Sequence, residues 1–189
     1  MRFLSTCFLL FLISCNGSGD TNEPKDVTKS RHDEAFNQSV RNSLDAYYAL
    51  TEAFVNYDSV NIPKLAADLQ QKISLLKPDE EDSTTANYIA RSQRHAAFIT
   101  EDHILDEKRR SLHALSESMF NYLEAVKYDK EKLYFQECPM AFNDTESGYW
   151  LSGADSIRNP YLGLYHPKYG KGMLKCGDNK SVINHIDSE

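Results

Sequence analysis

The chain has 189 residues, a net charge of −7 and a hydrophobic share of 41%. This length suits one domain with an independent core. The acidic excess excludes nucleic acid as a partner, because phosphate binding requires a basic surface. The nucleophile motif Gly-x-Ser-x-Gly is missing, as are the metal-hydrolase motif His-Glu-x-x-His and the redox motif Cys-x-x-Cys, so we expect no enzyme.

The first residues have the layout of a targeting segment. Arg2 supplies one positive charge, an apolar run covers 8–13, and Ser14 precedes Cys15. This layout resembles a bacterial lipoprotein signal, in which 1–14 are removed and Cys15 is acylated. We therefore expect a lipid-anchored protein of the bacterial cell envelope. The Asn at position 16, directly after this cysteine, resembles the pattern that sorts lipoproteins to the outer membrane. The alternative is an ordinary secretory peptide in which Cys15 has no role.

Residues 15–30 are polar and rich in Gly, Ser and Asn, which predicts a flexible tether. Apolar residues then recur at three- and four-residue steps, as in amphipathic helices. Helices are predicted at about 36–54, 60–76, 83–98 and 105–126. Their short connections favour an antiparallel up-down four-helix bundle over 31–128, and hence a mainly α fold.

The remainder of the predicted domain, which as a whole covers 31–189, has a different composition. Residues 129–183 form an appendix rich in aromatic and turn residues, and 184–189 form a polar tail. Strands are predicted at Leu133 to Gln136 and at Tyr149 to Ser152. Asn143-Asp144 and Ser147-Gly148 are the expected turns. We expect the aromatic side chains to seal this segment against the helices.

Four sulfur side chains gather in the appendix: Cys138, Met140, Met173 and Cys176. Thiolates and thioethers are ligands that a soft monovalent ion such as Cu(I) or Ag(I) prefers. Cys138 and Met140 lie two apart, so both face one side of an extended strand. Met173 and Cys176 lie three apart, which suits one turn of helix. The pattern therefore predicts a soft-metal site made of these four residues.

A disulfide between Cys138 and Cys176 is the competing interpretation. Cys7 is removed with the signal and Cys15 carries lipid, which leaves one pair of cysteines in an oxidising compartment. A bridge closes a loop of about 38 residues, which is worth about 4 kcal/mol of unfolding free energy in the chain-entropy estimate. Both interpretations stay open, and oxidation and reduction could alternate between them.

Other polar clusters give weaker signals. His166 is expected to be a solvated loop residue, with a role as an extra imidazole ligand as the alternative. The three histidines of the helical region are expected at surfaces or interfaces: His95, His103 and His113. The acidic run 79–82 predicts a solvated turn. Arg109-Arg110, with acidic residues nearby, predicts a salt-bridged helix face.

Several motifs resemble the DUF3347 family of Bacteroidetes envelope proteins. In the appendix they are Cys138-Pro139-Met140-Ala141, Gly148-Tyr149-Trp150-Leu151-Ser152, Ile157-Arg158-Asn159-Pro160-Tyr161 and Met173-Leu174-Lys175-Cys176-Gly177. In the helical region they are Arg109-Arg110 and Leu115-Ser116-Glu117-Ser118-Met119. The chain departs from the family by extra residues at 164–171.

The resemblance implies a function. This family occurs as stand-alone lipoproteins and as domains appended to periplasmic adaptor subunits of heavy-metal RND efflux pumps. It therefore implies a protein that binds or passes Cu(I) or Ag(I), with efflux adaptor or pump components as partners. The alternative function is a disulfide-stapled protein-protein interaction module of the envelope with no metal role.

Overall fold

The computed structural model describes residues 29–186. The predicted signal peptide and Cys15 lie outside the described residues, as does the tether up to residue 28. Ser30, at the end of the predicted tether, donates a hydrogen bond to Asp129 Oδ1 at 2.6 Å. The chain is therefore attached to the folded domain from Ser30 onward.

The four predicted helices are confirmed. They are α1 (Glu34–Val55), α2 (Ile62–Ile73), α3 (Ser83–Glu101) and α4 (Leu105–Ala125). Asp33 caps α1 by accepting the Phe36 N–H, and Asp82, from the acidic run, caps α3 by accepting the Thr84 N–H. The second helix begins at Ile62, with Pro63 in its first turn, where a missing N–H costs little.

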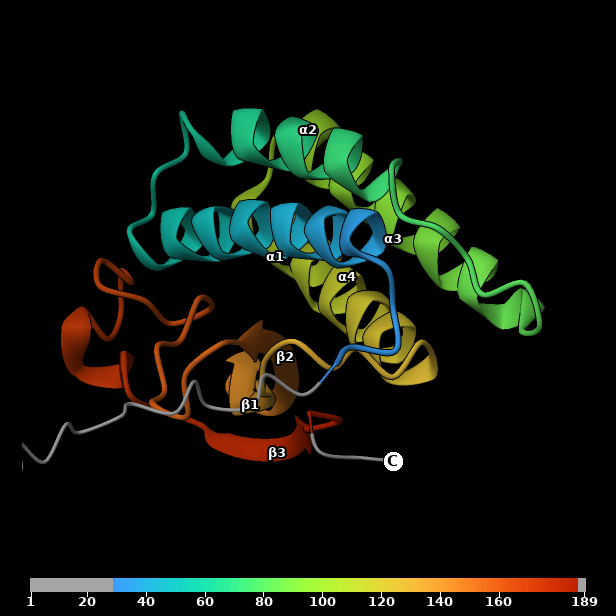
Figure 1. The fold of residues 1–189 in the computed structure, drawn as a ribbon. Coiled ribbons are helices and arrows are strands. Elements are labelled where there is room, and N and C mark those ends of the chain that lie inside the picture. Colours follow the sequence, from blue (N-terminus) through green and yellow to red (C-terminus); the bar gives the residue numbers. More distant parts are fainter. Residues whose placement is uncertain (1–28, 187–189) are drawn as a thin grey trace, which may run out of the picture.

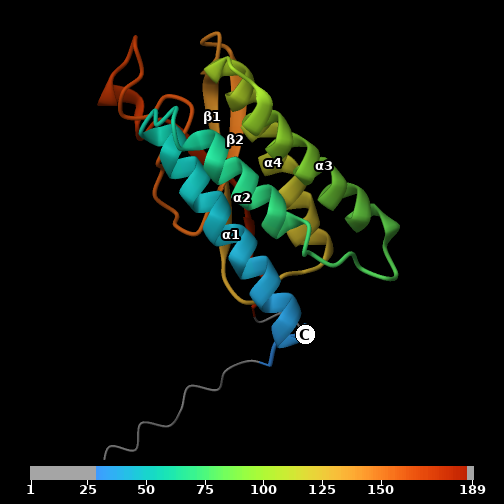
Figure 2. The same cartoon turned by 90° about the horizontal axis from the view of Figure 1, so that it is seen from above.

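Each helix packs most closely against the next one along the chain, and α4 also packs on the sheet. Figure 1 shows the four helices on one side of the small sheet, and in Figure 2 α2 lies between α1 and α3. Helix α1 reaches α4 through a long side chain, because the Tyr47 hydroxyl lies 2.6 Å from Ser116 Oγ. No helix within 29–186 is long and apolar enough to cross a bilayer.

The sheet has three antiparallel strands in the order β2-β1-β3. They are β1 (Leu133–Phe142), β2 (Glu146–Ser152) and β3 (Asp178–Ile183). Asn143 and Asp144 form the predicted turn, both with positive φ. The second predicted turn was wrong, because residues 147 and 148 lie inside β2. Strand β3 was not predicted, since all its residues except Ile183 are exposed and it lacks apolar alternation.

Helices and sheet share one hydrophobic core. Tyr47 of α1 is fully buried, and its hydroxyl accepts the Leu151 N–H of β2 at 3.0 Å. This hydrogen bond joins the helices to the sheet. The aromatic side chains of the appendix were expected to seal it against the helices. Trp150 and Tyr161 are buried accordingly, whereas Tyr165 is 67% exposed. The buried side chains of the appendix thus belong to the same hydrophobic core as those of the helices.

Candidate functional site

The structure brings the two cysteines of the appendix together. Cys138 lies in β1 with no exposed surface, and Cys176, just before β3, is half-buried. The two thiols are close enough for Cys176 to affect the ionisation of Cys138. The pairing of β1 with β3, whose last pair is Glu137 with Asp178, accounts for this proximity of residues far apart in the sequence.

Gly177 makes the close approach possible. Its φ of 141° is one that residues with a side chain rarely adopt, and a Cβ there would lie 2.5 Å from the Glu137 carbonyl oxygen. The residue next to Cys176 must therefore be glycine for the chain to pass this close to β1. Gly177 is therefore a structural requirement for placing Cys176 beside β1.

The environment of Cys138 favours its protonated form. Burial raises the pKa of this thiol to about 11, and the neighbouring Cys176 adds to the shift. The Met140 backbone N–H and the Asn159 side chain oppose it by hydrogen bonding to the sulfur. A thiolate at Cys138 therefore forms readily only when another positive charge, such as a metal ion, takes the proton's place.

Asn159 organises the loops around the thiols. Its Nδ2 donates to the Cys176 carbonyl oxygen at 2.8 Å, and its Oδ1 accepts the N–H groups of Tyr161 and Leu162. It is fully buried. The sequence motifs include Asn159 without assigning it a role. Its position before Pro160, in a turn-rich segment, was the available signal.

The two methionines lie close to the thiols along the chain, Met140 two residues after Cys138 and Met173 three residues before Cys176. Met140 and Met173 are both half-buried against the core. Met140 borders a cavity with Arg109 and His166. Met173 ends the short 3-10 helix η1 (Lys171–Met173), and its carbonyl oxygen accepts the Cys176 N–H at 2.9 Å. The single turn expected between Met173 and Cys176 is therefore present.

Harder ligands are scarce near the thiols. Between residues 29 and 186, no group of three or more His, Cys, Asp or Glu side chains is placed to hold a metal ion. His166 is half-buried, and its Nδ1 accepts the N–H groups of Lys168 and Tyr169. Any metal bound at Cys138 and Cys176 would therefore depend on sulfur ligands.

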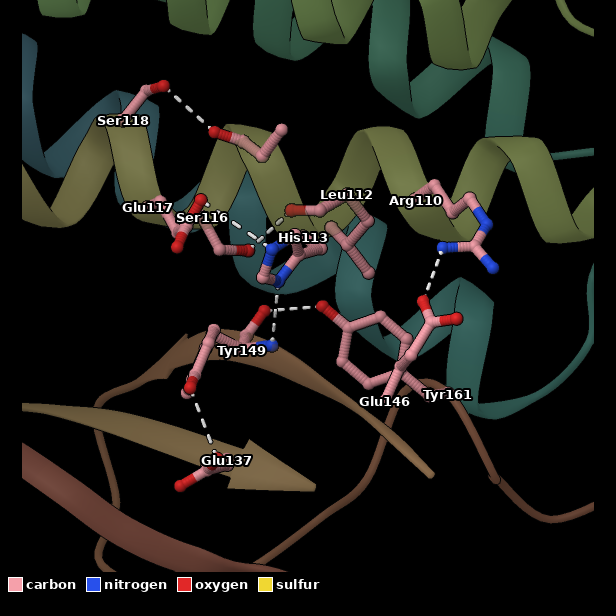
Figure 3. A network of polar contacts seen from close by, with 11 residues as sticks. Arg110, Leu112, His113, Ser116, Glu117, Ser118, Glu137, Glu146, Tyr149 and Tyr161 are labelled. Atoms are coloured by element: carbon pink, nitrogen blue, oxygen red, sulfur yellow. Dashed lines mark hydrogen bonds and ion pairs between the residues drawn. The ribbon is translucent and has the colours of Figure 1, made fainter. Parts of the chain in front are cut away.

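A polar network holds the sheet against α4 (Figure 3). His113 on α4 points toward β2 and accepts the Tyr149 N–H at Nδ1, at 3.2 Å. The Tyr161 hydroxyl donates to the Tyr149 carbonyl oxygen, and Arg110 pairs with Glu146 at 3.0 Å. Burial lowers the pKa of His113, which keeps its Nδ1 available as an acceptor. His113 is thus an interface histidine.

The expected salt-bridged face of α4 is present only in part. Arg109-Arg110 predicted a salt-bridged helix face, but only Arg109 pairs within the helix, with Asp106 at 3.0 Å. Arg109 is only 5% exposed, and Arg110 pairs with strand β2 instead. The charged pattern did not indicate that Arg109 is buried. Its burial comes from tertiary contacts, because Tyr57 and the loop after Tyr161 cover this end of α4.

The comparisons with known proteins support the family resemblance. The family described as "Protein of unknown function (DUF3347)" matches residues 44–131. The match confirms the DUF3347 resemblance for residues 44–131, which include the two motifs of the helical region. The match begins inside α1, covers the rest of the helical region and ends before β1, so the sulfur residues lie outside it. No curated protein and no solved structure matches the chain.

Proposed function

We propose that this protein is a lipid-anchored protein of the bacterial cell envelope whose Cys138 and Cys176 bind Cu(I) or Ag(I). One observation carries the proposal: two thiols about 38 residues apart are placed side by side by strand pairing. Two thiolates suffice as ligands for a soft monovalent ion. Met140 or Met173 would add a thioether, which needs no deprotonation.

The partners follow from the family resemblance. A protein that holds a soft ion without carrying out a reaction would pass it to a heavy-metal efflux adaptor or pump. The tether would place the domain at a distance from its membrane, which is the outer one by the Asn16 pattern. In this proposal the protein is a metal-binding protein and not an enzyme.

The alternative is a disulfide-stapled interaction module without metal. The complete burial of Cys138 and its raised pKa favour it, since the thiolate that metal binding needs is costly there. A bridge would tie the loop before β3 to β1 and so fix the edge strand. The two functions differ in the redox state of one pair of sulfur atoms.

The helical part would be classed as an antiparallel up-down bundle. Two features support this finer description. The connections between the helices are short, at 56–61, 74–82 and 102–104, and consecutive helices are the closest neighbours. Short connections favour antiparallel neighbours.

The methionines test the composition of the site. Met140→Leu and Met173→Leu keep volume and apolarity, so each is expected to cost under about 1.5 kcal/mol of unfolding free energy. If a thioether is a ligand, at least one of them weakens Cu(I) binding, because leucine offers no donor atom. Titration of the reduced protein against a competing Cu(I) chelator measures this. Equal affinity of wild type and both variants would remove the methionines from the site.

The anchor is tested at Cys15. Cys15→Ala is expected to leave the precursor unprocessed or to release the protein from the membrane fraction, because the acylated atom is missing. Cys7→Ala, within the predicted signal, is the matched control and should still be lipidated. Metabolic labelling with a fatty acid and membrane fractionation give the readout. Unchanged lipid labelling of the Cys15 variant would refute the anchor.

A further inference from the structure

One complete face of helix α3 is exposed. The helix packs on α2 and α4, and its buried side chains recur at three- and four-residue steps: Thr85, Ile89, Ser92, Ala96 and Ile99. The exposed side chains on the opposite side of the helix follow similar steps, and we call them the outer face: Ser83, Asn87, Ala90, Arg91, Arg94 and Phe98. In Figure 2, α3 lies at an edge of the helical part. The outer face is therefore open to a partner molecule.

Exposed apolar side chains lie near both ends of the outer face. Phe98, toward the end of α3, is 44% exposed, and Leu75, in the connection that leads into the start of α3, is 65% exposed. In the middle of the face the side chains are short, namely Asn87 and Ala90. Short side chains there allow a second helix to approach closely, because the distance between packed helices depends on the side chains at the contact.

The charges are distributed unevenly along this side of α3. Arg91 and Arg94 lie in the second half of the helix, and no acidic residue stands three or four positions from either of them. Neither arginine is therefore neutralised by a pair within the helix. The end at which α3 begins is acidic instead, because Glu80 and Glu81 are exposed there, just before the capping residue Asp82.

Other charges near the outer face do not reverse this distribution. Glu101, the last residue of α3, and Lys77, in the connection from α2, each have the opposite sign to their end of the helix. Both lie ten or more residues from Asn87, at the rim of the face. Glu117 of α4 lies 3.6 Å from His113 Nε2 and is thus engaged beside the sheet (Figure 3).

We propose that the outer face of α3 binds the outer face of a second copy of this protein, with the two helices antiparallel across a twofold axis near Asn87. Across such an axis, a residue after Asn87 in one copy faces the residue equally far before Asn87 in the other. Arg94 lies seven residues after Asn87, and Glu80 lies seven residues before it. The basic half of each copy therefore meets the acidic end of the other, and one contact contains this match twice.

The size of the contact indicates a weak dimer. Helix α3 has 19 residues and is therefore about 28 Å long. A contact made mainly by one helix lies at the lower end of specific interfaces. Phe98 of each copy approaches the connection that contains Leu75 of the other, which adds apolar area. The exposed ion pairs add little affinity each, but they select the antiparallel orientation. This inference does not depend on the proposed use of the cysteines.

Two double charge reversals test the pairing. Arg91→Glu with Arg94→Glu makes the outer face acidic at both ends, and Glu80→Lys with Glu81→Lys makes it basic at both ends. Each variant alone should associate with itself about tenfold more weakly than wild type, or less than that, because like charges then face each other. An equimolar mixture of the two variants should form dimers again, because an acidic face then meets a basic one.

Sedimentation velocity of the full-length protein over a range of concentrations gives the monomer–dimer equilibrium. A neutral detergent is present in excess, so that a micelle rarely holds two chains. Lys171→Glu with Lys175→Glu is the matched control, since it changes the net charge equally at two exposed positions of the appendix. This control should leave the dimer affinity within about threefold of wild type.

A second pair of variants does not change charge. Phe98→Ala should weaken the dimer, whereas Tyr165→Ala, at an exposed aromatic residue of the appendix, should not. This comparison decides if a charge-reversed variant does not fold. Recovery of dimers in the mixture would support the proposal. A wild type that is monomeric at every concentration, a mixture that stays monomeric although both variants fold, or equal weakening by Phe98→Ala and Tyr165→Ala would overturn it.

Discussion

Gly163→Ala is expected to lower the free energy of unfolding by about 2–4 kcal/mol. A Cβ at this position would lie 2.3 Å from the Val55 carbonyl oxygen at the end of α1. The same oxygen accepts the Leu164 N–H at 2.8 Å. The added methyl group therefore pushes two backbone segments apart and breaks the hydrogen bond that holds them.

Denaturant unfolding of the glycine variants measures this effect. Gly172→Ala is the matched control, because an added Cβ at Gly172 meets no atom within 4 Å. Its unfolding free energy should stay within about 1 kcal/mol of wild type. If Gly163→Ala were equally neutral, the packing of the appendix loop on α1 described above would be incorrect.

The affinity for Cu(I) is expected to rise by about tenfold per pH unit or more between pH 6 and 9. The ion must displace the proton of Cys138, and the pKa of this thiol, at about 11, lies above the whole range. Below its pKa the thiol is protonated, and the proton competes with Cu(I) for the sulfur. Each pH unit downward raises the proton concentration tenfold and so weakens the apparent affinity for Cu(I) about tenfold.

A competition titration repeated at each pH, with the chelator's own protonation taken into account, gives the slope. The Cys138→Ser variant is the control and should show a weaker affinity with a smaller slope. A slope of zero in the wild type would mean that thioethers alone hold the ion, because they bind without losing a proton.

The helices were predictable because local patterns determine them. Apolar residues at helical spacing define α1 and α4, and Asp33 and Asp82 mark the starts of α1 and α3. The start of the second helix was misplaced by two residues, since Val60 continues the apolar spacing but is 66% exposed. Its apolar side chain is not used by the core.

The sheet was only partly predictable. Strand β1 runs on through Pro139 and Met140, beyond its expected end at Gln136, because a register shift between Cys138 and Phe142 accommodates this stretch. Strand β3 consists of Asp-Asn-Lys-Ser followed by Val and Ile, and its pairing with β1 and the burial of Ile183 stabilise it. Pairing between distant segments leaves no local pattern in such a polar edge strand.

The candidate site, like the sheet, was only partly predictable from the sequence. The closeness of Cys138 and Cys176 was predictable, because two cysteines alone in one compact segment pair under either interpretation. The roles of Asn159 and Arg109 were not. Both depend on tertiary contacts, namely loop carbonyl and N–H groups around Asn159 and the Tyr57 ring over Arg109. A single sequence shows a polar residue there but not its burial.

The redox state of Cys138 and Cys176 in protein taken from the envelope tests the central claim most directly. Cells are quenched with acid, the protein is denatured, free thiols are alkylated, and mass spectrometry counts the labels on the two residues. Denaturation is needed because Cys138 is fully buried. A soft-metal site predicts two alkylated thiols, whereas an intact bridge between Cys138 and Cys176 in all molecules would contradict it and favour the stapled module.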